Sequence, residues 1–88
     1  MKNLESIQQD IENVSAIRLA VFYAGGQSEM ARKINALAGS RRVTQPGVNY
    51  WVTKNRVPAD RVLQIETVID EIVTRHQLRP DIYPLEGV

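Results

Sequence analysis

The sequence predicts an all-α protein, a small helical bundle that contains a helix-turn-helix. Apolar residues recur at intervals of three and four along most of the chain, and no segment alternates as a half-buried strand does. Helix caps and stops fall between the apolar runs. The chain has 88 residues, enough for one small core, so we expect residues 1–88 to form a single domain.

The first predicted helix occupies residues 1–14, with Asn3 placed to cap it. Its apolar residues form one narrow stripe. We expect this stripe either to pack on the protein's own core or to serve as a dimerisation surface or a site for a partner protein. The stripe consists of Leu4, Ile7, Ile11 and Val14.

Residues 15–39 predict two further helices separated by a pair of glycines. The first covers residues 15–24, and two starts remain open: Ser15 begins a new helix, or the preceding helix continues through it. The second begins at residue 27 and carries an apolar face of Met30, Ile34 and Leu37.

A strong start signal stands at residues 43–48. Thr44 is a cap residue, and Pro46 follows in the first turn, where its missing N–H does no harm. Val43 and Val48 have the spacing of a hydrophobic staple. The helix that begins here is expected to end at residues 54–56.

A fourth helix is predicted after Pro58, then a short turn at residues 74–78 and an irregular tail over residues 79–88. In the tail, Arg79 and Asp81 are expected to pair and to pin it against the fourth helix. His76 is expected to be a structural residue of the short turn. The apolar residues of the fourth helix are Val62, Ile65, Val68, Ile69 and Ile72, and its acidic run, expected to be solvated, is Glu66, Asp70 and Glu71.

The helices that flank residue 43 meet the requirements of a helix-turn-helix. Ala31 is small enough for a close crossing, and Val48 and Trp51 are core contacts three residues apart on the second helix. This geometry lays the second helix in the major groove of DNA, where Gln and Asn can pair with adenine and Thr can contact thymine. Trp51 is expected in the core and Tyr50 outside it. The expected base-reading residues are Thr44, Gln45, Asn49, Tyr50 and Thr53.

Charge is concentrated around the same segment. Residues 26–61 hold seven of the eleven Lys and Arg but two of the ten Asp and Glu, a formal charge of +5. Residues 1–26 and 62–88 carry −1 and −3. A concentrated positive patch favours binding to phosphates. The expected phosphate contacts are Gln27, Ser28, Lys33, Arg41, Arg42, Lys54 and Arg56.

Several other classes of protein find no support in the sequence. There is no Cys and a single His, so no metal site, cofactor site or catalytic set is predicted, and we expect no enzyme. No apolar run is long enough to span a membrane, and the first residues lack the order of a signal peptide. A cytoplasmic protein is therefore expected.

Four separated motifs, GGQSEMARKI, VTQPGVNYWV, RVPADRVLQIE and VTRHQLRPDIYP, resemble those of the YdaS-like group of Cro-type phage and prophage regulators. The resemblance covers about residues 17–84. It implies a compact Cro-like fold, binding of a homodimer to double-stranded operator DNA, and repression in a phage or prophage switch. Some members are antitoxin-like, so the alternative function is a protein-binding module that neutralises a toxin, mainly through residues 1–14 or the tail.

The chain departs from this group between Ile34 and Val43, where the eight residues NALAGSRR replace about one glycine. We expect an extended second helix that gains one turn and ends at Gly39. A long basic turn, residues 40–42, would then form a finger beside the recognition helix. The alternative is a floppy insertion without contacts.

Overall fold

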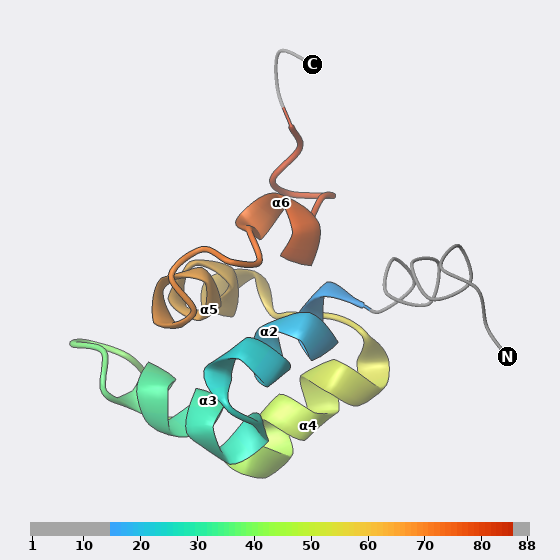
Figure 1. Ribbon diagram of the computed structural model, residues 1–88. Helices are drawn as coiled ribbons and strands as arrows, with labels where there is room; N and C mark the ends of the chain where they lie inside the picture. Colours follow the sequence, from blue (N-terminus) through green and yellow to red (C-terminus); the bar gives the residue numbers. More distant parts are fainter. Residues whose placement is uncertain (1–14, 86–88) are drawn as a thin grey trace, which may run out of the picture.

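The computed structural model describes residues 15–85, which form a bundle of short helices without a strand (Figure 1). The fold class is therefore all-α, as predicted. The helix expected at residues 1–14 lies outside the described residues. In chain order the elements are α2 (Ala16–Ala24), α3 (Gln27–Asn35), α4 (Gln45–Lys54), the 3-10 turn η1 (Ala59–Arg61), α5 (Val62–Val68) and α6 (Arg75–Leu78).

Helix α2 begins at a cap and ends at a glycine. The Oγ of Ser15 accepts a hydrogen bond from the backbone N–H of Arg18 at 3.3 Å, and the backbone of Ser15 is extended. A helix therefore starts here rather than running through Ser15. At the other end Gly25 has a φ of 99°, a left-handed conformation that glycine adopts without strain. The predicted stop at the glycine pair is confirmed.

Helix α3 is shorter than predicted, and the expected extra turn to Gly39 is wrong. The helix ends at Asn35, and tighter turns follow, in which Leu37 N–H donates to the Ile34 carbonyl at 3.0 Å. The side chain of Asn35 bonds both backbone groups of Val43 at 2.8 Å. This pair of bonds brings the returning chain against the end of α3, where another helical turn would stand.

Helix α4 begins as predicted. The Oγ1 of Thr44 accepts a hydrogen bond from the N–H of Gly47 at 3.2 Å, and Pro46 lies in the first turn. Val43 and Val48 are both buried. The helix ends at Lys54 and is followed by the cap residue Asn55, whose φ of 51° is left-handed.

Helix α5 also ends earlier than predicted. It stops at Val68, and the left-handed residues Asp70 and Glu71 turn the chain back. Ile72 therefore leaves the apolar stripe and is 55 % exposed. The cause lies in Glu66, which is buried and accepts hydrogen bonds from the backbone and guanidinium of Arg75. Tying the start of α6 to the middle of α5 requires a sharp return.

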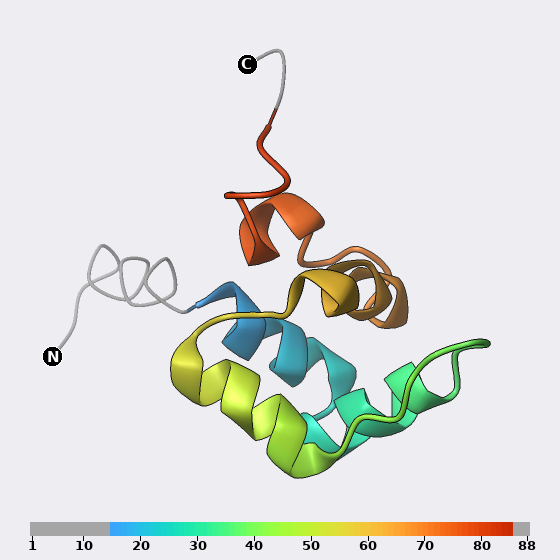
Figure 2. The same cartoon turned by 180° about the vertical axis from the view of Figure 1, so that it is seen from behind.

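The core lies where α2 packs against α3, α4, α5 and α6. Figure 2, from behind, shows α2 between α4 on one side and the pair α5 and α6 on the other. Within residues 15–85, no helix is long and apolar enough to cross a membrane. The buried apolar residues include Ile17, Ala20, Met30, Ala31, Ile34, Val48, Trp51, Val62, Ile65 and Val73.

Candidate nucleic-acid interface

The crossing of α3 and α4 has the form that the sequence predicted. Ala31 is buried on α3, and Val48 and Trp51 are buried on α4. These contacts use the inner side of α4. Its outer side is thereby left to solvent along the whole helix.

The outer face of α4 carries the predicted base-reading side chains. Gln45, Asn49, Tyr50 and Thr53 are all exposed, and Tyr50 is 62 % exposed. Thr44 is also exposed, but its hydroxyl oxygen caps the helix. Four of the five candidates therefore point out of the helix, and the fifth has a structural task as well.

A hydrogen-bonded chain of amides links this face to α3. The Nε2 of Gln27 donates to the Oδ1 of Asn49 at 3.1 Å, and the Nε2 of Gln45 donates to the Oε1 of Gln27. Gln27 thus holds two side chains of α4 at once. Each of the two has a second amide atom, the Oε1 of Gln45 and the Nδ2 of Asn49, which can bond a base edge. Gln27 was predicted as a phosphate contact, and the structure places it among the predicted base readers.

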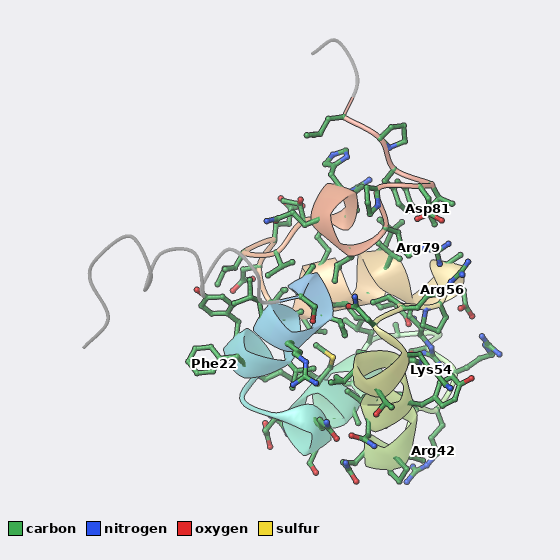
Figure 3. The ribbon with its side chains drawn as sticks, turned by 90° about the vertical axis from the view of Figure 1, so that its right-hand side faces the viewer. Phe22, Arg42, Lys54, Arg56, Arg79 and Asp81 are labelled. Atoms are coloured by element: carbon green, nitrogen blue, oxygen red, sulfur yellow. The ribbon has the colours of Figure 1, made fainter. Side chains whose placement is uncertain are left out.

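Three predicted phosphate contacts lie along one edge of the molecule. Figure 3 shows Arg42, Lys54 and Arg56 in succession beside α4, with Phe22 on the opposite side of the bundle. All three are exposed, and none belongs to an ion pair among residues 15–85. The Nζ of Lys54 lies 5.8 Å from the centroid of the Tyr50 ring. These three cations form a positively charged edge beside the candidate reading face.

The remaining predicted phosphate contacts have other surroundings. Lys33 donates from its Nζ to the Ala24 carbonyl at 2.9 Å, at the end of α2. Arg41 forms an ion pair with Asp60. Ser28 is exposed in the first turn of α3. The structure therefore does not bring Lys33 together with the cations of the edge, and it leaves Arg41 partly neutralised.

The basic turn at residues 40–42 is not a floppy insertion, because a buried arginine holds it. Arg61 is 7 % exposed, and its guanidinium donates to the carbonyls of Arg41 and Arg42 at 2.9 and 3.5 Å. Sequence reasoning missed both Arg61 and Asn35. The sequence did contain one indication for Arg61: it precedes Ile65 by four residues, in line with the apolar stripe of the helix predicted after Pro58. A cation in line with an apolar stripe can be buried when hydrogen bonds compensate its charge.

The tail is pinned by Arg79, as predicted, but to a different element. Its guanidinium forms two bonds with Asp81 at 2.9 and 2.7 Å and donates to the Val57 carbonyl at 2.7 Å. The tail is therefore tied to the segment between α4 and η1, and not to α5, the helix that follows Pro58. The hydrogen bond from Arg79 lowers the pKa of Asp81 to about 2.

The acidic run is not a solvated helix face throughout. Glu66 is 5 % exposed, and the hydrogen bonds from Arg75 lower its pKa. His76, which was expected to be a structural residue, forms a hydrogen bond between its Nδ1 and the Tyr83 carbonyl at 2.8 Å. These contacts are internal to the C-terminal part and leave α4 untouched.

Helices α3 and α4 cross as a helix-turn-helix, and the outer face of α4, the second helix of this motif, is exposed to solvent. This arrangement is that of a helix-turn-helix protein of the Cro type. The profile of the family described as "Bacterial toxin YdaS" matches residues 17–86, and the chain belongs to this family. The solved Cro protein from the putative prophage element Xfaso 1 in Xylella fastidiosa strain Ann-1 is similar in structure and sequence. Its TM-score is 0.71 at 30 % identity, over 82 % of this chain and 100 % of that one. No curated protein matches the chain.

These findings confirm the resemblance to the YdaS-like group of Cro-type regulators. The two comparisons differ in what they name, because the family is described as a toxin and the solved relative is described as a Cro protein.

Proposed function

We propose that the protein is a sequence-specific DNA-binding regulator of phage or prophage origin that reads operator DNA with α4. The observation that carries this proposal is the amide chain in which Gln27 holds Gln45 and Asn49 on an exposed helix face. Amide side chains fixed at such a face lose little freedom on binding a base edge.

The cations beside α4 support the same function. Arg42 stands near the start of the helix, and Lys54 and Arg56 stand at its end (Figure 3). Contacts to phosphates at both ends of a recognition helix fix its register in the groove, while the amides between them supply specificity. The acidic residues 62–88, with a formal charge of −3, would keep the other side of the molecule away from DNA.

The proposed mechanism is steric. A homodimer would place two copies of α4 in successive major grooves, about 34 Å apart, on a pseudo-palindromic operator. Polymerase would then be blocked. Several exposed apolar side chains could serve a dimer interface. They lie on α2, on α5, in the loop between α5 and α6 and in the segment after α6: Phe22, Leu63, Ile72, Ile82 and Leu85.

Titration of duplex DNA tests this function. The probe is a fluorescent duplex of the gene's own upstream region, with a scrambled duplex of the same composition as its control, each at low and moderate salt. We expect tighter binding to the native duplex and a steep loss of affinity as salt rises. Equal binding to both duplexes would refute sequence-specific recognition.

A matched pair of arginine variants tests the positive edge. Arg42→Ala should weaken binding to all sequences and reduce the salt slope by about one unit. Arg18→Ala removes the same charge from α2, four residues before Phe22 and so on the same face of that helix. Figure 3 shows Phe22 on the side of the bundle opposite the edge. Arg18→Ala should therefore leave the slope nearly unchanged. Equal effects of the two substitutions would mean that the edge does not contact phosphates.

The family description favours a second candidate, a protein-binding role in a toxin–antitoxin pair. The contacts for such a role would centre on residues 1–14, which lie outside the described residues, or on the tail. Deleting residues 1–14 and measuring DNA binding and partner binding separately distinguishes the two functions. A deletion that abolishes partner binding and spares DNA binding would support both roles in one protein.

A further inference from the structure

Arg61 is a buried cation whose hydrogen-bond partners among residues 15–85 are all neutral. Its side chain lies at the junction of η1 and α5, and the residue is 7 % exposed. No carboxylate among residues 15–85 forms an ion pair with it, because the neighbouring Asp60 pairs with Arg41. Burying a charge is costly unless hydrogen bonds compensate it. The hydrogen-bond acceptors of Arg61 therefore identify the segments of the chain that its guanidinium fixes.

Most of those acceptors belong to the basic turn. The Nη1 of Arg61 donates to the carbonyl of Arg41 at 2.9 Å and lies 3.4 Å from the Oγ of Ser40, and Nη2 donates to the carbonyl of Arg42 at 3.5 Å. A further bond to the Oε1 of Gln64 at 2.9 Å fixes the guanidinium on α5. One side chain thus ties three consecutive residues of the turn to the helical body.

Two other contacts close the same segment. Asn35 bonds the N–H and the carbonyl of Val43 at 2.8 Å each, directly after the residues that Arg61 holds. Arg41 is paired with Asp60. Figures 1 and 2 show the connection between α3 and α4, in green, extending away from the bundle on the side of α5. A segment that projects in this way would be free to move without such bonds.

From this arrangement we infer that Arg61 is a positioning residue, which fixes the turn of residues 40–42 so that Arg42 stands in place for a DNA phosphate. The inference rests on the proposed function, and it names a residue that contacts no DNA itself. A cation on a mobile turn must be ordered when it binds, and this ordering weakens binding. A turn already bonded through its own carbonyls avoids that cost. Arg61 therefore holds the backbone at Arg42 in one position before DNA binds.

Limited digestion with trypsin tests the hold on the turn without DNA. Arg61→Met keeps an apolar stem of similar length and removes the guanidinium. We expect cleavage after Arg41 and Arg42 to become about tenfold faster or more, because a hydrogen bond from a charged donor no longer opposes local opening. Cleavage at the wild-type rate would overturn the inference.

Arg79→Met is the matched control, since Arg79 is also a buried arginine, at 8 % exposure, bonded to a backbone carbonyl. It holds the tail instead of the turn. The two variants are compared at equal fractions of unfolded protein, set from urea titrations. Equally fast cleavage after Arg42 in both would show general destabilisation and overturn the inference. If Arg61→Met does not fold, Arg61→Lys replaces it, because lysine keeps the charge and the stem but lacks the planar fork.

A double-mutant cycle on DNA tests the consequence for binding. In the wild-type background, Arg42→Ala should reduce the salt slope by about one unit. In the Arg61→Met background the same substitution should change the slope much less, and an unchanged effect would overturn the inference. If the wild-type protein binds neither duplex, the proposed function fails. The trypsin rates then decide by themselves whether Arg61 holds the turn.

Discussion

Gln27, Gln45 and Asn49 act at the scale of single residues, because one amide of α3 fixes two amides of α4. We predict that Asn49→Ala or Gln45→Ala relaxes base preference at one operator position and costs about 1–3 kcal/mol there. The measurement is a set of titrations with duplexes that differ at single base pairs. Thr67→Ala on α5, whose hydroxyl bonds its own helix, is the control and should leave preferences unchanged.

The ion pair of Arg79 and Asp81 predicts a pH dependence of stability. The pKa of Asp81 is lowered from 3.8 to about 2, because Arg79 donates hydrogen bonds to the charged carboxylate. The stabilising effect is therefore fully present above the ordinary pKa and is lost as pH falls through about 2. Urea unfolding at a series of pH values between neutral and about 2 measures this loss.

Two substitutions isolate the contribution of that pair. Asp81→Asn should be less stable than wild type near neutral pH, and the difference should shrink in acid. Asp70→Asn removes an exposed carboxylate that has no ion pair among residues 15–85, and it should leave the acid slope close to that of wild type. An equal slope in wild type and Asp81→Asn would contradict the account of the tail.

Residues with a local role could be predicted from the sequence, and residues with a distant partner could not. Thr44, Val48 and Trp51 act within one helix or across a crossing of regular geometry, and all lie where the pattern placed them. Arg61 and Glu66 have partners 9 to 21 residues away. Such partners depend on how the whole chain returns, which periodicity does not encode.

At the scale of elements, the start signals were more informative than the stop signals. The caps at Ser15 and Thr44 define where α2 and α4 begin, since a side-chain oxygen bonds a free N–H in each. The ends of α3 and α5 were placed too late. In both cases a side chain of the helix bonds a residue further along the chain, Asn35 with Val43 and Glu66 with Arg75, and the chain turns back before the apolar pattern ends.

The cap of α4 gives a prediction that belongs to this scale. Thr44→Ala should lower the free energy of unfolding by about 0.5–2 kcal/mol, because one N–H at the start of the helix loses its acceptor. Thr44→Ser keeps the oxygen and should lose much less. Chemical denaturation of the three proteins measures the difference. Equal stability of Thr44→Ala and wild type would mean that the hydroxyl does not cap the helix in solution.

At the scale of the whole molecule, the distribution of charge agrees with the direction in which α4 faces. The exposed cations Arg42, Lys54 and Arg56 follow one edge, and the exposed aromatic Phe22 lies on the other side (Figure 3). Part of the formal charge of +5 on residues 26–61 therefore lies on the edge beside the candidate reading face. The sequence predicted the charge of this segment, but not that Lys33 and Arg41 would be engaged elsewhere.

The central claim is that α4 reads DNA, and amide chemical-shift mapping with the gene's own upstream duplex tests it most directly. We predict that the largest changes fall on α4, on the first turn of α3 and on residues 40–43, and that a scrambled duplex produces smaller changes. Changes centred on α6 or on the side of α2 that carries Phe22, with α4 unaffected, would contradict the account.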